Sequence, residues 1–370
     1  MSYEPLNGSY QQLSNYEPLN GSYQQLSSYE PLNGSYQQLS NYEPLNGSYQ
    51  QILCKPKTLF LVYIIFIIGL RGFIFTFAYF ALDSNINHKY HAKMNLLDLT
   101  SNELAEFNKD NTFVIVPLGS VEQHGPHLPL GTKCFLAETI AFEAAKKLKP
   151  ENINYVIAPV VPFMPCNTSA GFNGCFFTSA RTFSDMIYDI GCSFYDQGFR
   201  RLFFVNMSIS PEAIKAVQIA VDDLNKLNNY IVADPMPLWT FSKNDKLESI
   251  LKKAGIEASN EIHGDIKETS ALLHLDKQLL RSDLAYKLPP CIINKTWEVL
   301  KGHFSYKEMG SELGYLGSPA KATPEIGRFY IENAAQGLYS SMMYLHQGNA
   351  LPELPLQIRM LLKMVDIDEM

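Results

Sequence analysis

The chain of 370 residues is 46% hydrophobic and 18% charged, and its formal net charge is −7. This length accommodates one large α/β domain with additional segments, or two small domains. The acidic balance argues against nucleic acid as a partner, and six Cys without a CxxC pair exclude a disulfide scaffold and a four-cysteine zinc module.

Residues 1–52 repeat a unit of 13 residues, YEPLNGSYQQLSN, four times. Tyr and Leu are its only large apolar groups, which is too little apolar surface to offset the entropy lost on ordering. We therefore expect a disordered tail. Each unit carries two Tyr-x-x-Leu or Tyr-x-x-Ile sequences, which begin at Tyr3, Tyr10, Tyr16, Tyr23, Tyr29, Tyr36, Tyr42 and Tyr49. They resemble tyrosine sorting signals, so clathrin adaptors are candidate partners; an inert spacer is the alternative.

Residues 58–82 form an apolar run of 25 residues, long enough to cross a bilayer. Arg71 lies at its centre and costs roughly 2.5–3.5 kcal/mol on insertion scales, less than the surrounding Ile, Phe and Leu supply. The run predicts a single-pass anchor. Lys55 and Lys57 flank it more closely than Lys89 and Lys93, which favours a cytosolic N-terminus and an exoplasmic domain.

The remaining chain divides into a linker (83–94), a globular domain (95–348) and a C-terminal tail (349–370). Within the domain, strand-like runs alternate with segments of helical period. The predicted strands are 113–118, 154–160, 201–206 and 230–234, and the predicted helices are 136–148, 184–197, 211–227 and 268–280. This alternation predicts a layered α/β fold with a mostly parallel sheet, whose binding crevice lies at the carboxyl ends of the strands.

The loop directly after the first predicted strand contains the densest group of candidate ligands. Glu122 and His124 are separated by one residue, so both can point to the same side of an extended loop, and His127 follows. A carboxylate and imidazoles are good ligands for Zn²⁺ or Mn²⁺. Surface or structural histidines are the alternative interpretation.

This loop, PLGSVEQHGPHLPLGT (117–132), resembles the signature loop of the creatininase (creatinine amidohydrolase) family. IHGDIKETSALL (262–273) resembles the family's HAGxxETS segment, and GYLGSPAKATPEIGRFYIENAAQGL (314–338) resembles its glycine-rich stretch and closing helix. AGFNGCFFTSARTF (170–183) is a looser match. The resemblance covers the globular domain and neither the repeats nor the apolar run.

The resemblance implies a two-metal site that hydrolyses a small cyclic or linear amide, and a closed homo-oligomer. Two metal ions would clamp a bridging water and polarise the scissile carbonyl. Glu122 and His124 match the family's first two ligands, and Glu268 matches another carboxylate of the site. His263 matches the histidine that would act as general acid or base.

Three departures from the family pattern fall on the expected ligands. Lys133 stands where the family has an Asp that bridges the metals, and Ser208 stands where it has a His, with Ser210 following. Ser169 replaces a further family His. An ammonium does not ligate a metal, and its charge repels a nearby cation. Lys133 could instead pair with Glu122 or Glu268 and supply the missing positive charge.

Two hypotheses follow. The first is an anchored amidohydrolase with one Zn or Mn ion at Glu122, His124 and Glu268. The second is a pseudoenzyme without a metal, in which the fold serves as a binding or scaffold module.

Cysteines and glycosylation sequons add smaller expectations. Cys134 lies beside the predicted pocket as a candidate nucleophile, with a buried inert thiol as the alternative. In an exoplasmic domain, Cys166 and Cys175 could form a disulfide. Sequons occur in every repeat and at Asn167, Asn206 and Asn294 of the domain.

Overall fold

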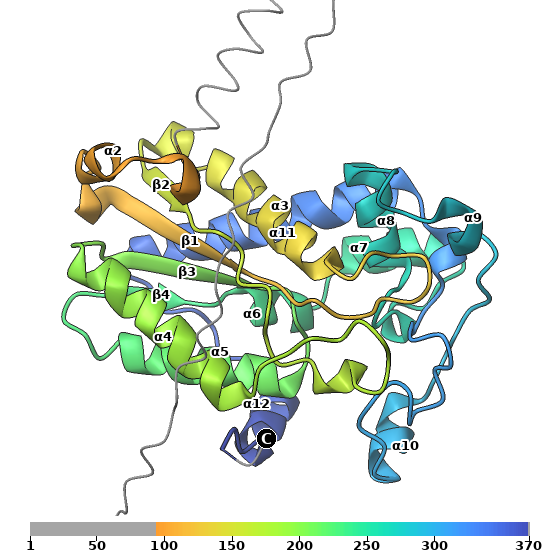
Figure 1. Cartoon of the computed structure of the whole chain (residues 1–370). Coiled ribbons are helices and arrows are strands. Elements are labelled where there is room, and N and C mark those ends of the chain that lie inside the picture. The colour runs from red at the N-terminus through yellow and green to blue at the C-terminus, as the bar shows by residue number, and fades with distance from the viewer. Residues whose placement is uncertain (1–93, 369–370) are drawn as a thin grey trace, which may run out of the picture. The chain divides into compact units, whose positions relative to one another are not determined.

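The computed structural model describes residues 94–368 (Figure 1). The predicted repeat tail, the predicted anchor at 58–82 and nearly all of the linker lie outside these residues. Among residues 94–368, no helix is both long enough and apolar enough to cross a membrane.

A sheet of four parallel strands forms the centre of the domain, in the order β2-β1-β3-β4. In register, Ile115 of β1 lies opposite Ile157 of β2 and Phe203 of β3. The strands are β1 (Thr112–Leu118), β2 (Asn154–Ile157), β3 (Arg201–Asn206) and β4 (Ile231–Ala233). All four predicted strands are therefore confirmed, and β2 and β4 are shorter than expected.

Both faces of the sheet are buried because side chains alternate across each strand. Phe113 and Ile115 pack into one apolar cluster with α3 (Thr132–Lys146) and α11 (Pro324–His346). Val114 and Val116 pack into a second cluster with α4 (Ala180–Asp196) and α5 (Pro211–Leu224). Figure 1 shows these helix pairs on opposite sides of the sheet. The described domain is thus a three-layer α/β structure, as predicted.

The shorter helices surround these layers. They are α2 (Ser101–Ala105), α6 (Met236–Phe241), α7 (Asp245–Lys253), α8 (Ile266–Leu275), α9 (Ser282–Ala285), α10 (Lys295–Leu300) and α12 (Leu356–Met364). Side-chain caps fix where several helices begin. Asp265 accepts the N–H groups of Lys267 and Glu268 at the start of α8, and Ser210 accepts that of Ala213 at the start of α5.

Helices α8 and α11 approach each other closely at Gly327. A Cβ atom at this position would lie 1.9 Å from the carbonyl oxygen of Ser270 on α8. Only the absence of a side chain permits this approach. The contact holds α8, which carries Glu268, against α11.

The segment after residue 348, predicted as a C-terminal tail, packs on the domain as far as it is described. Its helix α12 lies against α5. Leu362 and Ile367 are buried, and Arg181 of α4 forms an ion pair with Asp368 at 2.6 Å. The C-terminal segment therefore covers part of the second layer.

Candidate active site at the carboxyl edge of the sheet

The predicted site residues converge at the carboxyl ends of β1 and β3. Glu122 and His124 lie in the loop after β1, and the main-chain N–H of Glu122 donates to the carbonyl of Leu130 at 3.1 Å. This bond folds the loop back, so that Lys133, the second residue of α3, returns to Glu122. His263 is held by a two-residue antiparallel bridge with Leu316.

Every carboxylate oxygen of Glu122 already accepts hydrogen bonds. Oε1 accepts from the Ser120 hydroxyl at 2.7 Å and lies 3.0 Å from Nζ of Lys133. Oε2 accepts from the hydroxyl of Ser169. Glu122 is 1% exposed and Lys133 is 4% exposed. The carboxylate and the ammonium therefore form a buried, hydrogen-bonded ion pair.

The pair holds both groups in their charged forms. Burial opposes ionisation of Glu122, but the ammonium of Lys133, then the imidazoles of His263 and His124, and the Ser169 hydrogen bond outweigh it and hold its pKa well below the ordinary value. Burial likewise opposes the charge on Lys133, and Glu122, followed by Glu268, outweighs it and raises the lysine pKa.

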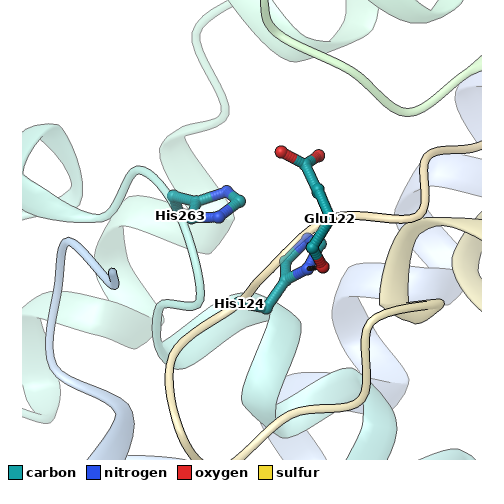
Figure 2. A group of neighbouring side chains, drawn as sticks. All are labelled: Glu122, His124 and His263. Atoms are coloured by element: carbon teal, nitrogen blue, oxygen red, sulfur yellow. Dashed lines mark hydrogen bonds between the residues drawn. The ribbon is translucent and has the colours of Figure 1, made fainter. Parts of the chain in front are cut away.

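The two imidazoles of the site, His124 and His263, stack with their ring centroids 4.4 Å apart. Figure 2 shows both rings beside Glu122. Nδ1 of His124 lies 3.0 Å from the carbonyl of Glu122, and Nε2 of His263 lies 2.7 Å from that of Gln123. Carbonyls only accept, so these nitrogens carry the protons. The opposite nitrogens, Nε2 of His124 and Nδ1 of His263, are buried without a hydrogen-bond partner. Burial, then the His124 charge, lowers the pKa of His263.

Glu268 lies beside these rings. Its Oε2 accepts the N–H of Gly264 at 2.7 Å and lies 3.9 Å from Nε2 of His124. His127, the third predicted candidate, is buried and does not join this group. Its Nε2 instead lies 2.8 Å from the hydroxyl of Thr269 on α8. Burial and the charge of His124 lower the pKa of His127 to about 4.

Tyr306 completes the site, and sequence reasoning missed it. Its ring lies 4.6 Å from that of His263, and it is 1% exposed. Its main-chain N–H donates to the carbonyl of Thr168 at 2.8 Å. Burial, helped by the Glu122 carboxylate and opposed by the Lys133 ammonium, raises the pKa of Tyr306 to about 12, so it stays neutral. Tyr306 precedes the glycine-rich stretch and lies in no recognised motif.

Ser208 is buried, and its hydrogen bonds stabilise the local backbone turn. Its N–H donates to Oδ1 of Asn206 at 2.8 Å, and its hydroxyl accepts the N–H of Ser210 at 3.2 Å. Ser210 in turn caps α5. The segment therefore organises the turn between β3 and α5. Asn206 is itself buried, which makes it a poor glycosylation acceptor in the folded domain.

The disulfide between Cys166 and Cys175 is not formed, whereas the buried, inert thiol expected as one alternative for Cys134 is confirmed. Cys166 and Cys175 are free thiols, and Sγ of Cys175 instead donates to the carbonyl of Ser169 at 3.0 Å. Cys134 is buried against the carbonyl of Ser120, and burial raises its thiol pKa to about 11. A thiolate nucleophile at Cys134 is therefore disfavoured.

The side chains gathered around Glu122 do not fit the two-metal centre that the resemblance implies. Lys133 places an ammonium where the resemblance implied a bridging carboxylate, and both oxygens of Glu122 already accept hydrogen bonds. Glu122, His124 and His263 do present ligand atoms that all lie within 4.8 Å of one another. Of the atoms of these three residues, Nε2 of His124 and Nδ1 of His263 are buried without a hydrogen-bond partner.

A family model and individual protein sequences both match this chain. The family model "Creatininase: Creatinine amidohydrolase" matches residues 97–342. A "Mycofactocin precursor peptide peptidase" of Mycobacterium ulcerans is 25% identical over 252 residues, which cover 66% of this chain and 90% of that protein. Its Mycobacterium tuberculosis counterpart is 28% identical over 127 residues, 33% of this chain, and this chain spans only half of its length.

Solved structures agree in fold. The structure "Creatininase Mn" superposes with a TM-score of 0.57 at 20% identity, over 68% of this chain and 98% of that chain. A putative creatinine amidohydrolase of Bacteroides fragilis gives a TM-score of 0.55 at 23% identity, over 71% and 99% of the respective chains. At these identities the likeness establishes the fold alone.

Proposed function

This chain belongs to the creatininase family, and from that premise we propose that its domain keeps the family fold as a metal-independent binding module. The fold is that of metal-dependent amidohydrolases. In the proposal, Lys133 supplies the positive charge that metal ions supply in the family, and two-metal amide hydrolysis is lost.

The observation that carries the proposal is the 3.0 Å contact between Nζ of Lys133 and Oε1 of Glu122. A buried carboxylate requires a partner charge, and here a covalently attached ammonium provides it. A divalent ion at the same place would meet the repulsion of that ammonium within a few ångströms. Displacing Lys133 would leave its charge buried without Glu122, so the pair opposes metal entry.

The test is metal stoichiometry of the purified full-length protein after incubation with excess Zn²⁺ or Mn²⁺ and desalting, measured by mass spectrometry. We expect far less than one ion per chain. Lys133→Asp combined with Ser208→His should raise the bound metal toward one ion or more. Lys146→Asp, at an exposed position of the same helix, is the matched control and should change nothing.

Near-stoichiometric metal in the unaltered protein would overturn the proposal. No gain in the double variant would mean that the pocket no longer has the family's ligand geometry, and metal independence would then not depend on Lys133 alone.

A second candidate is a hydrolase with one Zn or Mn ion, favoured by the two unpartnered imidazole nitrogens. His124, His263 and Glu122 would hold the ion, which when bound would polarise an amide carbonyl and activate water. His263 would then be a ligand and could not also serve as the proton carrier. Stoichiometric metal, followed by turnover in a screen of small amides and short peptides, would support this candidate.

For the segments outside the described residues, we propose a single-pass membrane anchor at 58–82, a cytosolic N-terminus, an exoplasmic domain and adaptor binding by the repeats. The support is the apolar run and the eight Tyr motifs. Deletion of 58–82 should release the protein from membranes at alkaline pH. Protease protection of the domain in sealed vesicles tests the orientation, and cleavage of the domain from the cytosolic side would contradict it.

A further inference from the structure

Away from the Lys133–Glu122 site, a cavity lies at the carboxyl end of β4, where Asp234 is the first residue after the strand. Its volume is about 130 Å³. Ile214 and Val221 of α5 and Leu238 of α6 form its walls, and Leu351 from the segment before α12 also lines it. Figure 1 shows α5, α6 and α12 gathered below this end of the sheet. The carboxyl edge of a parallel sheet is where open α/β folds bind ligands.

Asp234 is the charged group of this apolar cavity. Its Oδ1 accepts the N–H of Met236 at 3.2 Å. Burial raises its pKa to about 7, although hydrogen bonds from Met236 and Asn206 act in the opposite direction. Within the described part of the chain, no Lys, Arg or His forms an ion pair with Asp234.

Basic groups line an adjoining cavity of about 330 Å³, which shares Gln218 and Leu354 as lining residues. Lys215 and Lys363 line that second space, and Arg359 there pairs with Glu353 at 2.7 Å. Cations are therefore available near α12, yet none is paired with Asp234. A partly buried carboxylate without a counter-charge in an apolar cavity carries an energetic cost that a ligand's cation would remove.

We propose that this cavity binds a small organic cation, a primary ammonium on a compact apolar body, with Asp234 as its counter-ion. A cavity of about 150 Å³ accommodates benzene, so this one takes roughly six heavy atoms. The ammonium donates to the Asp234 carboxylate, and the apolar body contacts Ile214, Val221 and Leu238. The site is separate from the Lys133–Glu122 pair, and the inference does not depend on the function proposed above.

The probe is isopentylammonium, and calorimetry on the full-length protein measures its binding. Isopentanol, of the same shape without charge, and 4-methylpentanoate, of opposite charge, are the comparison ligands. We expect one ammonium ion per chain, bound at least tenfold more tightly than the alcohol, and no measurable binding of the carboxylate. No binding of the ammonium, or equal affinity for ammonium and alcohol, would overturn the proposal.

Two variants with matched controls locate the site. Asp234→Asn keeps the shape and removes the charge, so affinity for the ammonium should fall at least tenfold while that for the alcohol is unchanged. Leu238→Phe fills the cavity and should abolish binding of both. Asp189→Asn, exposed on α4, and Leu275→Phe, at an exposed position of α8, should bind like the unaltered protein. Binding that survives both site variants would place the ligand elsewhere and refute the assignment.

Discussion

The ammonium of Lys133 lies 3.0 Å from Oε1 of Glu122, with both side chains buried at the carboxyl end of β1. The residue that stands where the resemblance implied a metal ligand thus pairs with a neighbouring candidate ligand. This ion pair sets both the charge and the hydrogen bonding around Glu122. Its energetic consequences can be measured without knowing any substrate.

Lys133→Met should lower the free energy of unfolding by about 3–5 kcal/mol, because it leaves the Glu122 carboxylate buried without a counter-charge. Adding Glu122→Gln should recover much of that loss, since the double variant buries no charge at this position. Chemical denaturation followed by circular dichroism measures both. Lys146→Met breaks an exposed pair with Glu143 and should cost less than about 1 kcal/mol. Equal losses in the single and double variants would contradict the pairing.

His127 should make the domain less stable in acid. Its pKa is lowered from 6.5 to about 4, so the unfolded chain binds the proton more readily than the folded domain does. Stability from this residue is complete above about pH 6.5 and is lost as the pH falls toward 4, by roughly 3 kcal/mol. Denaturation midpoints of His127→Gln across this range should vary less with pH than those of the unaltered protein. Identical pH profiles would show that His127 titrates normally.

Asp234 should make the domain less stable as the pH rises, which is opposite to the effect of His127. Its pKa is raised from 3.8 to about 7, so the folded domain holds the proton more tightly than the unfolded chain does. Its contribution to stability is greatest below about pH 4 and declines as the pH rises to 7, by about 1–2 kcal/mol after allowance for its partial exposure. Asp234→Asn should therefore be more stable than the unaltered protein at pH 8. A destabilised Asp234→Asn at that pH would contradict the unpaired carboxylate.

Gly327→Ala should destabilise the domain by several kcal/mol, since the new Cβ would overlap the Ser270 carbonyl and force α8 and α11 apart. The change is expected to disturb Glu268, which α8 carries. Gly131→Ala is the control, because a Cβ there would meet only Phe135 at an ordinary 3.5 Å and φ is −86°. Denaturation midpoints compare the two, and similar values would mean that the helices adjust without cost.

The resemblance of the loop at 117–132 and of IHGDIKETS was sufficient to predict the fold. The alternation of apolar runs with helical segments predicted the layers, because one strand face and one helix stripe must each be buried. Glu122, His124, His263 and Glu268 were expected together and do meet. The differences from the resembled motifs at Lys133 and Ser208 were also readable from the sequence, because a motif specifies which residue type to expect at each position.

Tertiary structure alone decided which partners these residues took. The sequence left Lys133 free to pair with Glu122 or Glu268, and the folded-back loop after β1 selected Glu122. Tyr306 and Asp234 belong to no motif, and their surroundings are formed by segments that lie far away in the chain. Local sequence determines periodicity and turn chemistry, whereas burial and ion pairing depend on distances between segments that only the packed domain sets.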